Sequence, residues 1–135
     1  MYKRQVYVTD TANNKIVVYL KSGKYVREFG RYGELDTEFN QPVGIATDGN
    51  GLIYIADSQN DKIKKFTRDG TFIQSWGVRG SLPGQLITPF GLSYSGGKLY
   101  VAELGNHRIQ IFKSNGRFDS AYGAPAQNLH RGDIR

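Results

Sequence analysis

The sequence has no cysteine, one methionine, one tryptophan and two histidines among its 135 residues. Without cysteine, the chain has no disulfide, no thiolate metal ligand and no cysteine nucleophile. No apolar run approaches the roughly 20 residues that span a bilayer, and no apolar signal segment precedes Val6. We therefore expect no membrane partner, and these features do not identify a compartment.

Large side chains and glycine are abundant instead. Hydrophobic residues make up 39% of the chain and aromatic residues 13%, with 17 glycines. This content excludes a disordered chain, and the length suits one domain of about 100 to 200 residues. The formal net charge is +6, a surplus that could favour polyanions but also keeps many ordinary domains in solution.

One pattern occurs three times, at intervals of 47 and then 46 residues. A short strand-like segment ends in an acid, an asparagine follows three residues later, and a basic residue and an isoleucine come next. The acid, asparagine and basic residue are Asp10, Asn13 and Lys15, then Asp57, Asn60 and Lys62, then Glu103, Asn106 and Arg108. A glycine turn and a strand with two aromatic residues complete each repeat.

The segments of each repeat predict strands rather than helices. They contain four to six residues, are rich in β-branched and aromatic side chains, and sustain no helical apolar stripe. Residues 42–46 and 89–93 add a strand that begins with proline, with Gly44 and Gly91 where backbones would approach closely. Four antiparallel strands in about 45 residues predict one blade of a β-propeller.

Together the motifs Pro-x-Gly-[Ile/Leu], [Ile/Leu]-Tyr-[Val/Ile]-Ala-[Asp/Glu] and Asn-x-[Lys/Arg]-Ile resemble NHL repeats, the units of NHL β-propellers. The resemblance covers roughly residues 6–123. It implies an all-β fold, a partial propeller of four-stranded antiparallel blades at about 6–30, 42–77 and 89–123. It implies little about function, because one propeller scaffold carries unrelated activities.

The predicted propeller is incomplete, because the first blade lacks its inner strand and a ring needs about 4 to 8 blades. We expect a fragment of a longer propeller. The alternative is self-association, in which two copies exchange strands to make a six-bladed ring. Residues 1–5 are expected to be a non-native leader, and residues 124–135 an irregular tail or the start of the next blade.

The candidate binding residues lie on one face of the ring, in the loops that join successive blades and in the loop between the second and third strands of each repeat. These are Arg31, Tyr32, Lys62, Arg79 and Arg108, with Lys15 and Asn106 at the margin. The cations could hold phosphates while Tyr32 stacks on a base. Alternatively, the recurring cation is structural and pairs with the acid of its own repeat. Glu34, Asp36, Glu38 and Asp61 also dilute any positive field there.

The recurring acids could converge on a cation, but turn formation explains them better. Asp and Asn side chains bind nearby backbone N–H groups. We therefore interpret Asp10, Asp57, Glu103, Asn13 and Asn60 as structural turn residues and expect no metal.

Catalytic groups are scarce in this sequence. His107 and His130 have neither zinc-site spacing nor partners for a nucleophile. Peptide-amidating lyases resemble NHL propellers and use metal-binding histidines, but the inner strands here have none. We expect no catalytic residue and no cofactor, and we predict that the chain is not an enzyme.

The sequence thus favours a noncatalytic binding module that takes a protein or peptide on the loop-bearing face. One alternative is single-stranded RNA on a cationic face. Another is a fragment of a propeller enzyme whose catalytic residues lie outside this chain.

Overall fold

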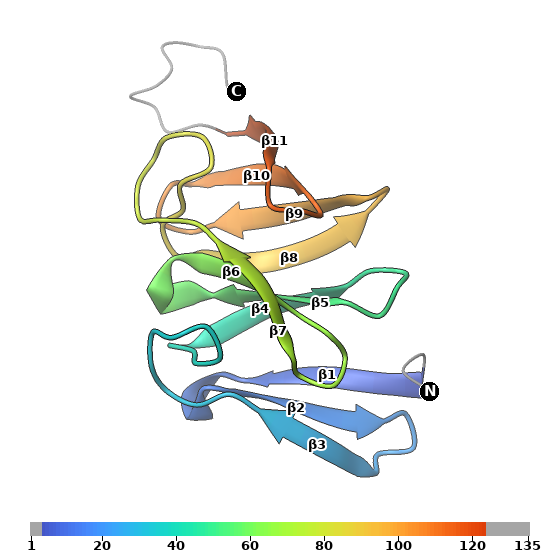
Figure 1. The fold of residues 1–135 in the computed structure, drawn as a ribbon. Helices are drawn as coiled ribbons and strands as arrows, with labels where there is room; N and C mark the ends of the chain where they lie inside the picture. Colours follow the sequence, from blue (N-terminus) through green and yellow to red (C-terminus); the bar gives the residue numbers. More distant parts are fainter. Residues whose placement is uncertain (1–3, 124–135) are drawn as a thin grey trace.

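The computed structural model describes residues 4–123. The predicted tail at 124–135 and the first three residues of the predicted leader lie outside the described residues, as does His130. The described part is all-β, as predicted, and it forms three antiparallel sheets stacked side by side (Figure 1). We call these sheets blades 1, 2 and 3.

Each blade is a meander in which strands pair in the order of the sequence. Blade 1 contains β1 (Gln5–Asp10), β2 (Lys15–Leu20) and β3 (Tyr25–Phe29). Blade 2 contains β4 (Pro42–Thr47), β5 (Ile53–Asp57), β6 (Lys62–Phe66) and β7 (Phe72–Trp76). Blade 3 contains β8 (Pro89–Ser95), β9 (Lys98–Glu103), β10 (Arg108–Lys113) and β11 (Phe118–Tyr122). Short 3₁₀ turns, η2 (Thr11–Asn13) and η3 (Ser58–Asn60), follow β1 and β5.

The meander gives the stack two different ends. The connections from one blade to the next, residues 30–41 and 77–88, lie at the same end as η2 and η3, on the left in Figure 1. We call this end the loop face. The tight turns β2–β3, β4–β5, β6–β7, β8–β9 and β10–β11 lie at the opposite end, which we call the hairpin face.

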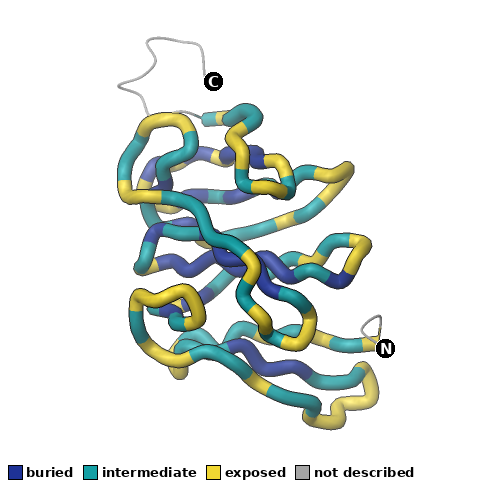
Figure 2. The backbone as a smooth tube through the Cα atoms, in the orientation of Figure 1, coloured by how far each residue is buried: buried dark blue, intermediate teal, exposed yellow. Residues whose placement is uncertain are grey.

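Apolar side chains cover both faces of blade 2, because a blade lies on each side of it. Ile53, Ile55 and Phe66 belong to the cluster shared with blade 1, whereas Tyr54 and Ile63 belong to the cluster shared with blade 3. All five are fully buried. Figure 2 shows buried residues along the central strands and exposed residues at the turns. The solid apolar run of β5 is thus explained by burial on both sides.

The inner strands β4 and β8 lie beside each other. The close backbone approach expected at Gly44 and Gly91 is found at Gly44. A Cβ atom at Gly44 would lie 2.2 Å from the carbonyl oxygen of Phe90, so only glycine permits this approach. A Cβ atom at Gly91 would meet only the Cβ of Ala102, at 3.7 Å. The close contact therefore depends on Gly44.

Blade 1 has three strands, so β1 is an edge strand within the described residues. It packs against β4, where the hydroxyls of Thr9 and Thr11 donate to the carbonyls of Val43 and Pro42 at 2.9 and 2.8 Å. Gln5, within the predicted leader, is the first residue of β1. No helix among residues 4–123 is long and apolar enough to cross a membrane.

Candidate functional site

A groove of about 780 Å³ opens on the loop face between the loop at residues 32–35 and η3. A second hollow of about 470 Å³ lies beside η2. Tyr32 and Asn40 line both of them. Tyr32 and Leu35 are 69% and 67% exposed, so two large apolar side chains stand in solvent at the groove. The remaining lining residues of the first groove are Gly33, Glu34, Gln59, Asn60 and Asp61.

The loop that carries Tyr32 is braced from within. Phe39 donates its N–H to the carbonyl of Arg31 at 2.7 Å, and its ring is fully buried between blades 1 and 2. The carboxylate of Glu38 accepts from the N–H of Leu35 at 3.1 Å and from Arg31 Nε at 3.2 Å. The Leu35 hydrogen bond, helped by Arg31, holds the pKa of Glu38 below its ordinary value. The loop therefore presents Tyr32 and Leu35 on a fixed frame.

A buried ion pair fastens the same loop to blade 2. Lys64 Nζ lies 2.9 Å from Asp57 Oδ2, and both side chains are at most 1% exposed. The same ammonium donates to the carbonyls of Leu35 and Glu38, at 2.9 and 2.5 Å. Asp57 Oδ1 accepts from the N–H of Asn40 at 2.7 Å. One charged pair thus fixes the loop at three backbone positions, all next to the groove.

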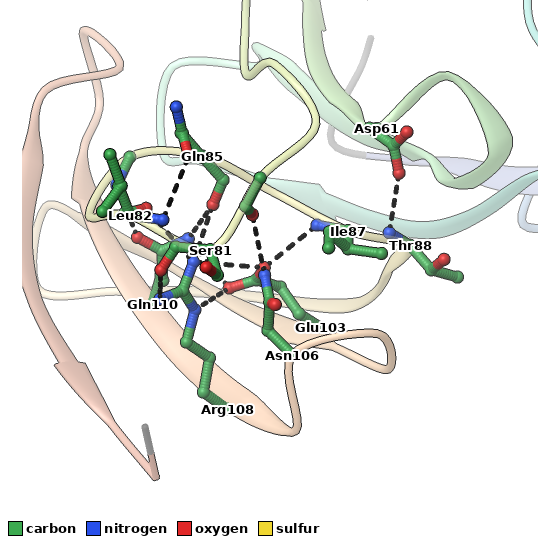
Figure 3. Close-up of polar contacts among 12 residues, drawn as sticks. Asp61, Ser81, Leu82, Gln85, Ile87, Thr88, Glu103, Asn106, Arg108 and Gln110 are labelled. Carbon is green, nitrogen blue, oxygen red and sulfur yellow. Dashed lines mark hydrogen bonds and ion pairs between the residues drawn. The ribbon is translucent and has the colours of Figure 1, made fainter. Parts of the chain in front are cut away.

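Blade 3 holds its own connecting loop with a different set of side chains (Figure 3). Arg108 Nε donates to Glu103 Oε2 at 2.6 Å, and Gln110 Nε2 donates to the same oxygen at 2.8 Å. The Arg108 guanidinium also donates to the carbonyls of Ser81, Leu82 and Gln85. Arg108 is 7% exposed, because its donors are used by the loop that covers it.

The end of each connecting loop is held by the blade before it. Asn14 Oδ1 accepts from the N–H of Gln41 at 2.7 Å, and Asp61 Oδ1 accepts from the N–H of Thr88 at 2.8 Å (Figure 3). Gln41 and Thr88 have φ angles of 60° and 53°. Such a conformation is strained for a β-branched residue such as Thr88, so the hydrogen bond that its N–H donates to Asp61 helps to keep it.

The predicted binding residues divide into exposed and internal ones. Tyr32 lines the groove, while Arg31 and Arg79 have side chains 80% and 68% exposed and pair with Glu38 and Asp61. The other four lie elsewhere. Lys15 pairs with Glu28, Lys62 donates to the carbonyl of Gly77, and Arg108 and Asn106 are buried. The structure therefore differs from the predicted exposed cationic face at Arg108 and Asn106, because backbone carbonyls and Glu103 use their donors.

The recurring acids accept hydrogen bonds from the asparagines of their own turns, whereas bonds to nearby backbone N–H groups were expected from the sequence. Asn13, Asn60 and Asn106 each donate to the acid three residues earlier, Asp10, Asp57 and Glu103. Asn60 and Asn106 donate as well to the carbonyls of Gly33 and Gly80, in the connecting loops. Asn60 and Asn106 therefore join their turns to the connecting loops at residues 30–41 and 77–88. Among residues 4–123, no group of three or more His, Asp or Glu side chains could hold a metal ion.

Sequence reasoning missed Lys64 and Gln110. Both occupy the repeat position of Val17, so recurrence does not reveal them. The available signal was a polar residue within an otherwise apolar strand, as at Lys64 between Ile63 and Phe66. Such a residue in a buried strand needs polar partners, and here the connecting loops provide them.

Carboxylates outnumber cations on the loop face. Among the described residues, the cations of this end are Lys15, Arg31, Lys62, Lys64, Arg79 and Arg108. The carboxylates are Asp10, Glu28, Glu34, Asp36, Glu38, Asp57, Asp61 and Glu103. Six cations against eight carboxylates do not make the cationic surface that a phosphate backbone needs.

Comparison with protein families decides the architecture. The sequence model described as "6-bladed beta-propeller" matches residues 1–78, which is more than half of the chain. The chain belongs to the 6-bladed β-propeller family. The NHL repeat model matches residues 86–112 of this propeller chain, which confirms the resemblance to NHL repeats.

Solved structures share the fold of this partial propeller. A streptogramin B lyase is 24% identical with a TM-score of 0.70, over 90% of this chain and 38% of that chain. A catalytically inactive virginiamycin B lyase from Staphylococcus aureus, solved with quinupristin, is 22% identical with a TM-score of 0.68, over 90% of this chain and 38% of that chain. A chain of a nidogen/laminin complex is 14% identical with a TM-score of 0.70, over 93% of this chain and 44% of that chain. No curated protein matches the sequence. The propeller chain thus spans less than half the length of these solved chains, and the likeness concerns the fold.

The prediction that the chain is not an enzyme is wrong, because neither this fold nor its few histidines exclude catalysis. Two of the similar structures are lyases, so the same architecture carries catalysis in other proteins. At 22 to 24% identity these lyases do not establish an enzyme role for this partial propeller.

Proposed function

We propose that this propeller binds an extended peptide segment of a partner protein in the groove beside Tyr32. The observation that carries the proposal is the pair of exposed apolar side chains, Tyr32 and Leu35, at the lip of the groove. Asn40, Gln59 and Asn60 surround them with amide groups that can bind a peptide backbone. An apolar anchor ringed by polar groups is the usual form of a binding surface.

The rigidity of the loop supports the same proposal. Lys64, Glu38 and Phe39 fix the loop that carries Tyr32 and Leu35, so little conformational freedom is lost when a ligand binds. Preorganised surfaces bind more tightly for this reason. A structure of a nidogen/laminin complex is among the similar folds, which gives a propeller with a protein partner as a precedent.

The charge of the loop face favours a neutral or basic peptide over RNA. Its two most exposed cations, Arg31 and Arg79, already pair with carboxylates. Glu34 and Asp36 are exposed beside them. A phosphate backbone would meet an excess of negative charge here, whereas a peptide with lysine or arginine next to an apolar residue would not.

Panning a phage-displayed library of random peptides against the purified chain tests the proposal. We expect enrichment of peptides with an apolar residue, and a loss of affinity of about 30-fold for Tyr32→Ala, because truncating an aromatic anchor costs about 2 kcal/mol. Fluorescence anisotropy with the enriched peptides measures the loss. Tyr25→Ala is the matched control, because Tyr25 is 53% exposed on blade 1 and does not line the groove.

Two results would contradict this assignment. One is panning that enriches no peptide. The other is enriched peptides that bind Tyr32→Ala as tightly as they bind the original chain, which would move the binding surface away from the groove.

A further inference from the structure

Charge is separated between the two ends of the molecule. The cations on or touching the hairpins are Arg4, Lys21, Lys24, Arg27, Lys65, Arg68, Lys98, Lys113 and Arg117. The carboxylates of that end, among residues 4–123, are Asp48, Asp69 and Asp119. Nine cations against three carboxylates give the hairpin face a formal charge of +6, while the loop face is net negative. The positive surplus of residues 4–123 therefore lies on the end opposite the peptide groove.

The three carboxylates of the hairpin face are engaged locally. Asp48 accepts from the N–H groups of Asn50 and Leu52 at 2.8 and 3.0 Å. Asp69 accepts from the hydroxyls of Thr67 and Thr71, and Lys98 lies 3.1 Å from Asp119. These bonds to Asp69 and Asp119 hold the pKa of each carboxyl below its ordinary value, so both are charged at neutral pH. The cations still outnumber them threefold.

Most of the cations project into solvent at the turns. Arg4, Lys21, Lys24, Arg68, Lys113 and Arg117 are exposed. Because the β2–β3, β6–β7 and β10–β11 turns all lie at this end of the stack, three successive blades present their cations in the same direction. Each outer turn contributes at least one exposed cation, from residues 21–24, 68–71 and 113–117.

The turns are fixed relative to one another by contacts between blades. Arg27 of blade 1 donates to the carbonyl of Arg68 at 3.1 Å. Lys65 and Gln74 of blade 2 donate to the carbonyls of Ser114 and Asn115, at 2.8 and 2.5 Å. The outer turns of blades 2 and 3 therefore each rest on the blade before them, which fixes their exposed cations relative to that blade.

We propose that the hairpin face docks on the surface of an anionic lipid bilayer. A planar surface can touch three separate turns at once, and each nearby cation adds about 1 kcal/mol of attraction. Single-stranded nucleic acid fits less well, since its binding relies on stacking rings and residues 21–24, 68–71 and 113–117 contain no aromatic residue. The exposed rings that follow two of these turns, Tyr25 and Phe118, pack edge-on against Tyr19 and Phe112 of their own blades. These turns also contain no large apolar residue to insert, so the contact is electrostatic and reversible.

This inference revises the expectation of no membrane partner, which rested on the lack of a spanning segment. A peripheral contact needs no such segment. The negative loop face is repelled by the same surface, so the bilayer orients the molecule with its groove toward solvent. The docking does not depend on the groove having a peptide ligand.

Co-sedimentation with vesicles tests the docking. We expect the chain to bind vesicles of phosphatidylcholine and phosphatidylserine in equal parts, and not vesicles of phosphatidylcholine alone. Binding should vanish near 1 M salt, where the screening length falls to about 3 Å. The double variant Lys24→Gln/Arg117→Gln should lower the partition coefficient about 30-fold, at about 1 kcal/mol per cation.

The matched control is Arg31→Gln/Arg79→Gln, which removes two exposed cations from the loop face and should not lower vesicle binding. Circular dichroism checks that both variants keep their β-sheet signature. The proposal is overturned by no vesicle binding, by equal binding to neutral vesicles, or by equal losses in the two variants. Binding to poly-uridine in place of vesicles, lost in Lys24→Gln/Arg117→Gln, also overturns it and assigns the face to nucleic acid. None of these outcomes bears on the peptide panning.

Discussion

Lys64 has an ammonium group that is fully enclosed and shared among three acceptors, Asp57 and the carbonyls of Leu35 and Glu38. Replacing it by methionine keeps most of the side-chain volume but leaves the Asp57 charge and two carbonyls unpaired. Removing one partner of a buried ion pair costs about 3 to 5 kcal/mol. We therefore expect Lys64→Met to lower the free energy of unfolding by about that amount, measured by urea denaturation.

Lys62→Met is the comparison for this prediction, because Lys62 is half-buried and donates one hydrogen bond, to the carbonyl of Gly77. Its loss should cost about 1 kcal/mol. Equal losses for the two variants would mean that the Lys64 pair does not hold the loop.

Recurrence in the sequence points to Lys62, which occupies the basic position found in every repeat, and not to Lys64. At the scale of residues, only positions that recur could be predicted. Positions that serve the same purpose in every blade repeat, as do Asp57 and Asn60. The residue that anchors each connecting loop changes from blade to blade, because it fits a loop of different sequence. Its identity emerges only when the loop and the strand are brought together.

The connecting loops show the same contrast at the scale of elements. Residues 31–41 are held by Asp57 and Lys64, whereas residues 78–88 are held by Glu103, Arg108 and Gln110. The longer arm of Glu103 still reaches the N–H of Ile87, at 3.1 Å, while its other oxygen binds Arg108. Two different polar sets thus achieve the same loop position on equivalent strands.

Arg108→Lys tests how specific the second set is. Lysine keeps the charge but lacks the planar fork that reaches several carbonyls at once. We expect faster hydrogen exchange at the amides of Gln85 and Leu86, whose loop loses its guanidinium contacts, with little change at Phe39 in the other loop. Exchange measured by mass spectrometry on peptides from both loops gives the comparison.

Unchanged protection at Gln85 and Leu86 would show that Gln110 and Asn106 hold the loop without the guanidinium. Faster exchange in both loops alike would indicate a loss of global stability rather than of this local anchor.

At the scale of the whole molecule, the period of about 45 residues was sufficient to predict blades, since each unit can bury its apolar faces only against its neighbours. The groove was not predictable in this way, because it is formed by loop residues whose spacing follows no period. Charge separation was missed for a related reason. The loop-face cations were recognised in the sequence, and the pairing of Arg108 with Glu103 was one of its two alternatives, but the pairing of Arg31 with Glu38 and of Arg79 with Asp61 appears only in three dimensions.

The close approach of β4 and β8 gives a test of how the blades are spaced. A methyl group at Gly44 would lie 2.2 Å from the carbonyl oxygen of Phe90, so Gly44→Ala must push blades 2 and 3 apart. Overpacking of this kind costs about 1 to 3 kcal/mol, and we expect the free energy of unfolding, measured by urea denaturation, to fall by that amount.

Gly91→Ala is the matched control, because its methyl group would meet only the Cβ of Ala102 at 3.7 Å. It should leave stability unchanged or raise it slightly, by restricting the unfolded chain. Equal stability of Gly44→Ala and Gly91→Ala would contradict this prediction. It would mean that the carbonyl of Phe90 does not approach Gly44 as closely as this structure shows.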